Sequence, residues 1–143
     1  MSTKIDTLIK QAIQIAKYVA LQPNQSFEER TATILQYRAL SFLEKSKENK
    51  LSDVANDLQA SLSSTTQLVE RLHKGGLLER REDLHDRRVT LLTITKKGQE
   101  RLKRMKENKR LRMKNLLSNI EQQDIDTLIK IQEKIIINLK KTE

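Results

Sequence analysis

Two short polar segments in the middle of the chain carry side chains suited to contacting a nucleic acid. The first has hydroxyl and amide groups at helical spacing, at Ser63, Ser64, Thr66 and Gln67. Small hydroxyl side chains allow a helix N-terminus to approach the major groove closely, and a Gln amide can form two hydrogen bonds with adenine. The second segment, from Arg80 to Arg88, contains four arginines and three acids. An arginine near the end of a thin β-ribbon can enter the minor groove, where the potential is most negative.

Each segment has a simpler explanation when it is taken alone. Ser and Thr clusters often only cap a helix, and a charged turn is usually just solvated. The order of the two segments along the chain favours DNA binding, because the hydroxyl cluster lies between a short helix and the arginine-bearing hairpin. A helix and a ribbon arranged in this order can read adjacent grooves together. Within the hairpin, Asp86 is expected to hold Arg88 in position.

The composition argues against catalysis. His73 and His85 are the only histidines, and neither has the spacing of a zinc-protease motif or lies near a serine elbow. The chain has no cysteine, which excludes disulfides, thiol nucleophiles and cysteine-built zinc sites. Gly75 and Gly76 end a helix instead of following a strand, so they do not form a phosphate loop. We therefore predict no enzymatic activity, no cofactor and no metal site.

The charge balance indicates a polyanionic partner. Lys and Arg number 28 against 19 Asp and Glu, a formal net charge of +9. Most of the excess lies between Lys96 and Lys114, which hold ten basic residues and only two acids, Glu100 and Glu107. Such a charge attracts nucleic acids over long range, although a merely soluble basic surface is the alternative.

Apolar residues at three- and four-residue spacing predict helices along most of the chain. The first twenty residues form an amphipathic helix, and Gln22, Pro23 and Asn24 break it. Ser26 and Glu29 have the spacing of a capping box that begins a second helix. The side of that helix predicted to be buried comprises Phe27, Ile34, Leu35, Phe42 and Leu43.

Further caps and turns divide the middle and end of the chain. Ser52 is predicted to cap a short third helix and Ser61 a fourth, which Gly75 and Gly76 end. LLERRE and VTLLTIT then predict a β-hairpin. Thr95 caps a long fifth helix, and a sixth follows the turn at Ser118. No run approaches the roughly 18 apolar residues of a membrane span, so we expect a cytoplasmic protein that makes no membrane contact.

The predicted fold class is mainly α with a small β-hairpin wing (α+β), in one domain over residues 1–143. A winged helix-turn-helix lobe occupies residues 47–98, and residues 1–22 and 99–143 form a helical dimerisation region. The terminal helices carry broad isoleucine-rich faces that the small lobe cannot cover. A second copy of the chain is the simplest cover, and bundling of these helices within one subunit is the alternative.

The order of these motifs resembles the MarR family of winged-helix transcriptional regulators. That family has a Ser-led recognition helix, a GL-x-ER segment, a D-x-R wing and an LT-x-x-G segment. The matching residues are Ser61, Gly76 with Leu77, Glu79 with Arg80, Asp86 with Arg87 and Arg88, and Ile94 with Thr95 and Gly98. The motifs cover about a third of the chain, and the flanking helices match the family layout over nearly all of it.

The resemblance implies a homodimer whose two lobes bind double-stranded DNA at a pseudo-palindromic operator. It implies a repressor that a small-molecule effector releases from DNA. It also implies that Arg88 enters the minor groove with Asp86 as its orienting partner, and that Arg71 and Lys74 contact the DNA backbone. The full set of DNA-binding residues predicted is Ser61, Ser63, Ser64, Thr66, Gln67, Arg71, Lys74, Arg87 and Arg88.

Departures from the family pattern concern base preference and sensing. Leu62 stands where a polar or basic residue is usual, Gln67 stands where arginine is common, and the wing tip lacks a proline. The absence of cysteine excludes thiol-oxidation sensing. Any ligand pocket would lie near Tyr18, Tyr37, Arg38 and the start of the fifth helix, although core or interface packing is the favoured explanation of these residues. Two other functions stay open: a non-specific nucleic-acid or chromatin-associated protein, and a winged-helix module that binds a protein.

Overall fold

The computed structural model describes residues 2–20 and 25–142. The chain divides into two compact units, residues 1–109 and 110–143, and the boundary falls inside one long helix. The predicted division at residues 98 and 99 stays a prediction, and the predicted break at Gln22, Pro23 and Asn24 lies outside the described residues.

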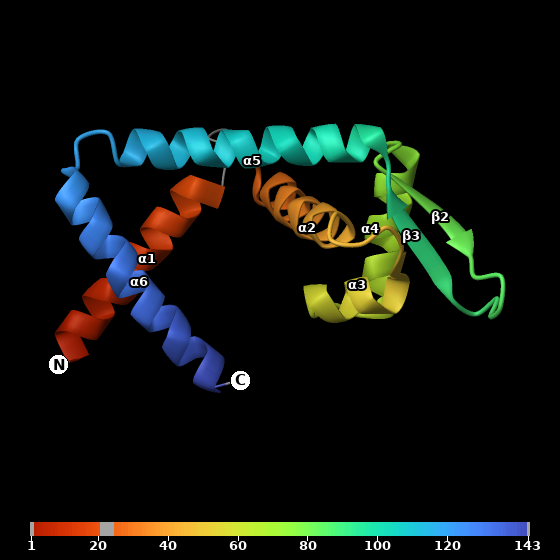
Figure 1. Ribbon diagram of the computed structural model, residues 1–143, viewed down its shortest axis with the longest axis horizontal. Coiled ribbons are helices and arrows are strands. Elements are labelled where there is room, and N and C mark those ends of the chain that lie inside the picture. The colour runs from red at the N-terminus through yellow and green to blue at the C-terminus, as the bar shows by residue number, and fades with distance from the viewer. Residues whose placement is uncertain (1, 21–24, 143) are drawn as a thin grey trace. The chain divides into compact units, whose positions relative to one another are not determined.

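The described elements are mainly helical, which confirms the predicted fold class (Figure 1). In chain order they are α1 (Ser2–Ala20), α2 (Phe27–Leu43), β1 (Asn49–Lys50), α3 (Leu51–Leu58), α4 (Leu62–Lys74), β2 (Leu78–Glu82), β3 (Thr90–Ile94), α5 (Lys96–Leu116) and α6 (Gln122–Thr142). No helix in the described ranges is long and apolar enough to cross a membrane.

The strands form one antiparallel sheet in the order β1-β3-β2. The predicted hairpin is present, with Leu78 opposite Ile94 and Glu82 opposite Thr90. We name residues 78–94 the wing, and residues 83–89 the wing tip. The wing projects away from the helices around it (Figure 1). The sequence did not predict β1, because a strand of two residues is too short to show an alternating pattern.

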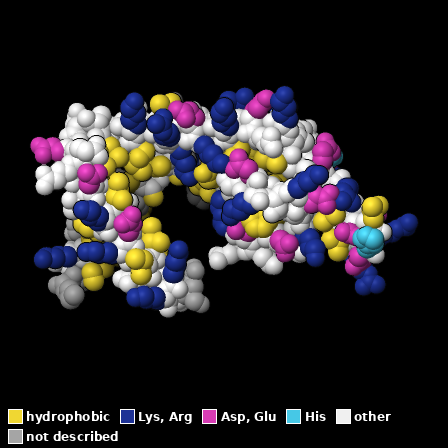
Figure 2. Space-filling model, viewed as in Figure 1, with side chains coloured by type: hydrophobic (Ala, Val, Ile, Leu, Met, Phe, Trp, Pro, Cys, Tyr) yellow, Lys and Arg dark blue, Asp and Glu magenta, His cyan; other side chains and the backbone are white. Residues whose placement is uncertain are grey.

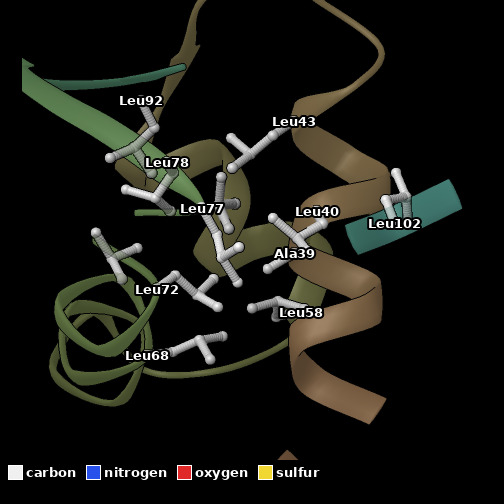
Figure 3. Close-up of a cluster of buried hydrophobic side chains, with 12 residues drawn as sticks. Ala39, Leu40, Leu43, Leu58, Leu68, Leu72, Leu77, Leu78, Leu92 and Leu102 are labelled. Atoms are coloured by element: carbon white, nitrogen blue, oxygen red, sulfur yellow. The ribbon is translucent and has the colours of Figure 1, made fainter. Parts of the chain in front are cut away.

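A leucine-rich core holds α2, α3, α4, α5 and the sheet together (Figure 3). Its completely buried members are Leu40, Leu43, Leu78, Leu92, Leu102 and Val54. Each buried side chain of this kind stabilises the fold by roughly 1.5–3 kcal/mol. The predicted inner face of α4 is confirmed, since Thr65, Leu68, Val69 and Leu72 are all buried. The opposite face of α4 is thereby turned outwards.

Most predicted caps are confirmed by hydrogen bonds. Ser26 and Glu29 form the capping box of α2, Ser61 caps α4, and the Thr95 hydroxyl accepts a hydrogen bond from the Gly98 N–H at 3.0 Å. The prediction for Ser52 was wrong. Helix α3 begins at Leu51, and its cap position, Lys50, makes no side-chain cap. Asn49 and Lys50 are paired with β3, so the chain passes directly from strand to helix.

The predicted buried side of α2 was only partly right. Leu43 is buried, but Ile34 is 39% exposed and Leu35 is partly buried. Ile34 precedes Leu43 by nine residues, which is two and a half helical turns, so the two side chains lie on opposite sides of the helix. Ala39 and Leu40 complete the buried side instead. The side chain of Phe27 lies outside the described residues.

The terminal helices leave their apolar faces uncovered within the described structure. On α1, Ile5, Leu8, Ile9 and Ile13 are 50–64% exposed. In the second unit, α6 has no buried residue, and its apolar face comprises Leu128, Ile129, Ile135, Ile136 and Leu139. Contiguous apolar surface of this kind usually marks a place where another protein chain binds.

Candidate DNA-binding interface

The start of α4 is held by a hydroxyl network at Ser61. The Ser61 Oγ accepts a hydrogen bond from the Ser64 backbone N–H at 3.1 Å and donates its own proton to the Ser64 Oγ at 2.9 Å. Ser61 is therefore occupied with the cap, while Ser64 keeps its own hydroxyl proton for an outside acceptor. Ser61, predicted to bind DNA, has a structural role here that does not depend on a ligand.

The exposed face of α4 presents a row of side chains with no hydrogen-bond partner in the described part of the chain. Ser63, Gln67 and Arg71 are exposed and follow one another at four-residue spacing, so they lie along one side of the helix. Thr66 lies beside this row, but its hydroxyl donates to the Leu62 carbonyl at 2.7 Å. Thr66 therefore offers a methyl group and an acceptor, while Gln67 offers a free amide.

The four wing arginines divide into two kinds. Arg80 forms an ion pair with Glu70 of α4, and Arg81 forms one with Glu48 at 2.6 Å. Arg87 and Arg88 are exposed, and within the described residues their guanidinium groups have no acidic partner. Exposed ion pairs contribute only about 0–1 kcal/mol of stability. The charges of Arg80 and Arg81 are thus compensated by acidic partners, whereas Arg87 and Arg88 keep their charges free.

Glu70 also faces Lys74, whose Nζ lies 3.8 Å from a carboxylate oxygen. One carboxylate thus faces two cations, Arg80 and Lys74. Lys74, predicted to contact the DNA backbone, offers a partly compensated charge, whereas Arg71 has no such acidic neighbour in the described residues. Figure 2 shows Lys and Arg side chains projecting at the end of the wing.

Hydrogen bonds fix the conformation of the wing tip. The Asp83 carboxylate accepts from the His85 N–H at 2.7 Å and from the Asp86 N–H at 3.1 Å. The Asp83 N–H donates to the Val89 carbonyl at 2.9 Å. The Asp86 carboxylate accepts from the backbone N–H of Arg88 at 3.0 Å. Asp86 therefore acts on the backbone of Arg88 and leaves the guanidinium free to point outwards.

Backbone hydrogen bonds to the Asp83 carboxylate lower its pKa below the ordinary value of 3.8. A lowered pKa means that the ionised form stabilises the tip above pH 3.8, and that this contribution is lost as the pH falls through the lower value. We expect the carboxyl carbon signal of Asp83, followed by NMR, to titrate below pH 3.8. In Asp86→Asn, Asp83 keeps both donors and should titrate alike. A midpoint for Asp83 at or above 3.8 would contradict the hydrogen-bonded tip.

The glycine and threonine motif residues join the base of the wing to α5. The Thr95 hydroxyl donates to the Gly76 carbonyl at 2.6 Å, and the Thr95 N–H donates to the Leu77 carbonyl at 3.2 Å. Gly76 has φ 72°, a left-handed conformation that favours glycine. Gly98 lies against Leu77 so closely that a Cβ there would be 2.0 Å from the Leu77 carbonyl oxygen. These motif residues therefore have structural roles.

The remaining candidates for chemistry have structural roles as well. His73 Nδ1 lies 3.1 Å from the Leu78 carbonyl oxygen, which only accepts, so that nitrogen carries the proton. Arg38 donates to the Asp57 carbonyl, and the Lys109 ammonium lies 4.1 Å from the centre of the Tyr37 ring. These contacts support the packing interpretation of Tyr37 and Arg38. Among the described residues no three His, Asp or Glu side chains gather in a way that could hold a metal.

Comparisons with known proteins agree with this architecture. The model of the MarR family matches residues 32–90. The uncharacterised HTH-type transcriptional regulator YfiV of Bacillus subtilis is 32% identical over 109 residues, which cover 74% of this chain and 68% of that protein. The HTH-type transcriptional repressor IacR of Pseudomonas putida is 27% identical over 104 residues, 73% of this chain and 62% of that protein. The chain thus spans about two thirds of the length of these relatives.

Solved structures share the fold over nearly the whole chain. The YusO protein of Bacillus subtilis superposes with a TM-score of 0.76 at 23% identity, covering 94% of both chains. Streptococcus pneumoniae FabT, solved in complex with DNA, superposes with a TM-score of 0.66 at 17% identity and covers all of both chains. The order of α3, α4 and the wing, together with the sequence match to YfiV, confirms the resemblance found in the motifs. This chain belongs to the MarR family of winged-helix, DNA-binding transcriptional regulators.

Proposed function

We propose that this protein is a sequence-specific repressor that binds a pseudo-palindromic operator as a homodimer. The main support is that certain polar side chains have no partner within the described part of the chain. On α4, one row of exposed side chains makes no side-chain hydrogen bond there: Ser63, Gln67 and Arg71. At the wing tip, which hydrogen bonds hold in place, the guanidinium groups of Arg87 and Arg88 have no acidic partner there. In this assignment α4 lies in the major groove and Arg88 in the adjacent minor groove.

The assignment gives the α4 side chains different tasks. Gln67 has a free amide that can bond bidentately to adenine, and the Thr66 methyl suits contact with a thymine methyl. Ser63 and Ser64 have hydroxyl protons for bases or nearby phosphates, and Arg71 has a charge for the backbone. Lys74 contributes less than Arg71 to backbone binding, because Glu70 lies 3.8 Å from its ammonium group. Asp86 positions Arg88 through the backbone hydrogen bond.

The homodimer is supported by the uncovered apolar faces of α1 and α6. Each face carries isoleucines and leucines that are about half exposed, such as Ile9 at 52% and Ile135 at 54%. A two-fold related copy would cover these faces and would match the symmetry of a palindromic operator. Repression is supported by relatives that are transcriptional repressors, such as IacR of Pseudomonas putida.

The proposal also covers location and chemistry. The protein acts in the cytoplasm, where it reaches the DNA. It performs no catalytic step and needs no metal or cofactor. A small-molecule effector that releases DNA remains part of the proposal on the strength of the family membership alone. The basic first half of α5 adds long-range attraction to the duplex.

Selection of bound sequences from a random duplex pool tests the proposal. We expect one enriched sequence with two inverted half-sites about 10 base pairs apart, bound by two chains. Enrichment of a sequence without two-fold symmetry would contradict the dimeric arrangement. A pool that stays random while still binding at low salt would favour a non-specific nucleic-acid-binding protein, and no binding at all would favour a protein-interaction module.

A further inference from the structure

Leu84 stands in solvent at the wing tip. It is 88% exposed, the highest value among the large hydrophobic side chains that the structure describes. The exposed isoleucines of α1 and α6 belong to contiguous apolar faces. Leu84 is instead flanked in the sequence by the polar residues Asp83, His85 and Asp86. Turn tips favour Gly, Pro, Asn, Asp and Ser, so turn chemistry gives no reason for a leucine at this position.

The tip presents Leu84 in a fixed place. Asp83 before it accepts hydrogen bonds from the two backbone N–H groups after it, those of His85 and Asp86. The chain on both sides is closed by the hydrogen bonds between Asp83 and Val89 and between Val89 and Asp86, each 2.9 Å long. These hydrogen bonds hold the backbone on both sides of Leu84, and its side chain lies in solvent, 88% exposed. An apolar group held outwards in this way is preorganised for a partner.

The free cations beside Leu84 indicate what the partner is. Arg87 and Arg88 lie three and four residues further along the same short tip, and neither has an acidic partner in the described residues. A tip that presents free guanidinium groups and one apolar side chain suits the minor groove, which has a strongly negative potential and apolar deoxyribose walls. An apolar partner protein would leave these guanidinium groups unpaired at the contact, which is unfavourable.

We propose that Leu84 is a direct apolar contact to the operator, seated against the minor-groove walls beside Arg88. This inference rests on the proposed function and adds to it a residue that gives binding energy without charge. The contact is sensitive to groove width, because an apolar side chain gains only where both walls are close. Leu84 therefore favours narrow, A·T-rich sequence under the wing, at positions where no base edge is hydrogen-bonded.

The test uses the full chain and a duplex that carries the sequence recovered from the random pool. Leu84→Ala is expected to weaken binding about five- to twentyfold, because part of the leucine surface is buried only in the complex. Leu84→Met, which keeps an apolar side chain of similar volume, should restore most of the affinity. The unfolding midpoint of both variants should equal that of the wild type, because Leu84 is 88% exposed in the folded protein.

Salt dependence separates this contact from a charge contact. Leu84→Ala should lower affinity by the same factor at every salt concentration, whereas Arg88→Ala removes a cation and should also flatten the slope of affinity against salt. If Leu84→Ala binds within twofold of the wild type while Arg88→Ala is weakened, the inference about Leu84 is wrong and the proposed function stands. If the wild type does not prefer the selected duplex to random duplex, the proposed function and this inference are both wrong.

Discussion

Gly98→Ala is expected to destabilise the winged-helix lobe by about 3 kcal/mol or more. A Cβ at this position would lie 2.0 Å from the Leu77 carbonyl oxygen and 2.8 Å from Ile94 Cγ1. The first neighbour is backbone and cannot rotate away, so α5 must separate from the turn between α4 and β2. That movement would also draw Leu102 out of the core, where it is completely buried. Urea unfolding followed by circular dichroism measures the loss.

Gly75→Ala is the matched control for this substitution. Gly75 has φ −75°, and a Cβ added there would have its nearest neighbours at 3.5 Å or more, which is ordinary contact. Replacing a glycine with alanine at such a position usually stabilises a protein, by about 0.4–1 kcal/mol. The two substitutions add the same methyl group and are expected to act in opposite directions. A Gly98→Ala variant as stable as the wild type would contradict the packing of α5 on Leu77.

Arg88→Ala is expected to weaken operator binding by about 1–3 kcal/mol, roughly five- to 150-fold. The guanidinium of Arg88 is free in the described residues, while Asp86 holds its backbone N–H at 3.0 Å. The side chain is therefore available to the minor groove from a fixed starting point. Arg88→Lys keeps the charge but loses the planar guanidinium, so we expect an intermediate affinity. Titration of the selected duplex followed by fluorescence anisotropy measures each affinity.

Arg81→Ala is the control for the loss of one positive charge from the wing. Arg81 is paired with Glu48 at 2.6 Å, so its charge is already compensated. At about 0.15 M salt, screening extends over roughly 8 Å, and the effect of this substitution on DNA binding should be small. Equal losses in Arg81→Ala and Arg88→Ala would show that bulk charge, and not placement, determines the contribution of the wing.

The sequence predicted the elements whose signals are local. Each predicted cap that was confirmed is a polar residue just before an apolar periodic run. Ser26, with Glu29, caps α2, Ser61 caps α4 and Thr95 caps α5. The inner face of α4 followed from periodicity because a helix packed on one side has a single buried stripe. The wing strands were predicted because their β-prone runs flank a polar turn.

The features that the sequence missed depend on contacts between distant residues. Strand β1 exists because Asn49 and Lys50 pair with β3, and no two-residue pattern reveals this. Arg80 and Arg81 look equivalent to Arg87 and Arg88 in the sequence. Only the fold brings Glu70 and Glu48, which are 10 and 33 residues away, to the first two. Tertiary structure therefore determines which arginines have no acidic partner in the described residues, and the proposed site depends on these two, Arg87 and Arg88.

The ratio of two affinities decides whether α4 and the wing read sequence through the placement of a few side chains, as we claim, or bind through the net charge of +9. Titration at one fixed salt concentration compares the selected duplex with a scrambled duplex of the same length and composition. We predict that the selected duplex binds at least about a thousandfold more tightly, the lower end of the range for specific regulators. Equal affinity for the two duplexes would contradict the claim.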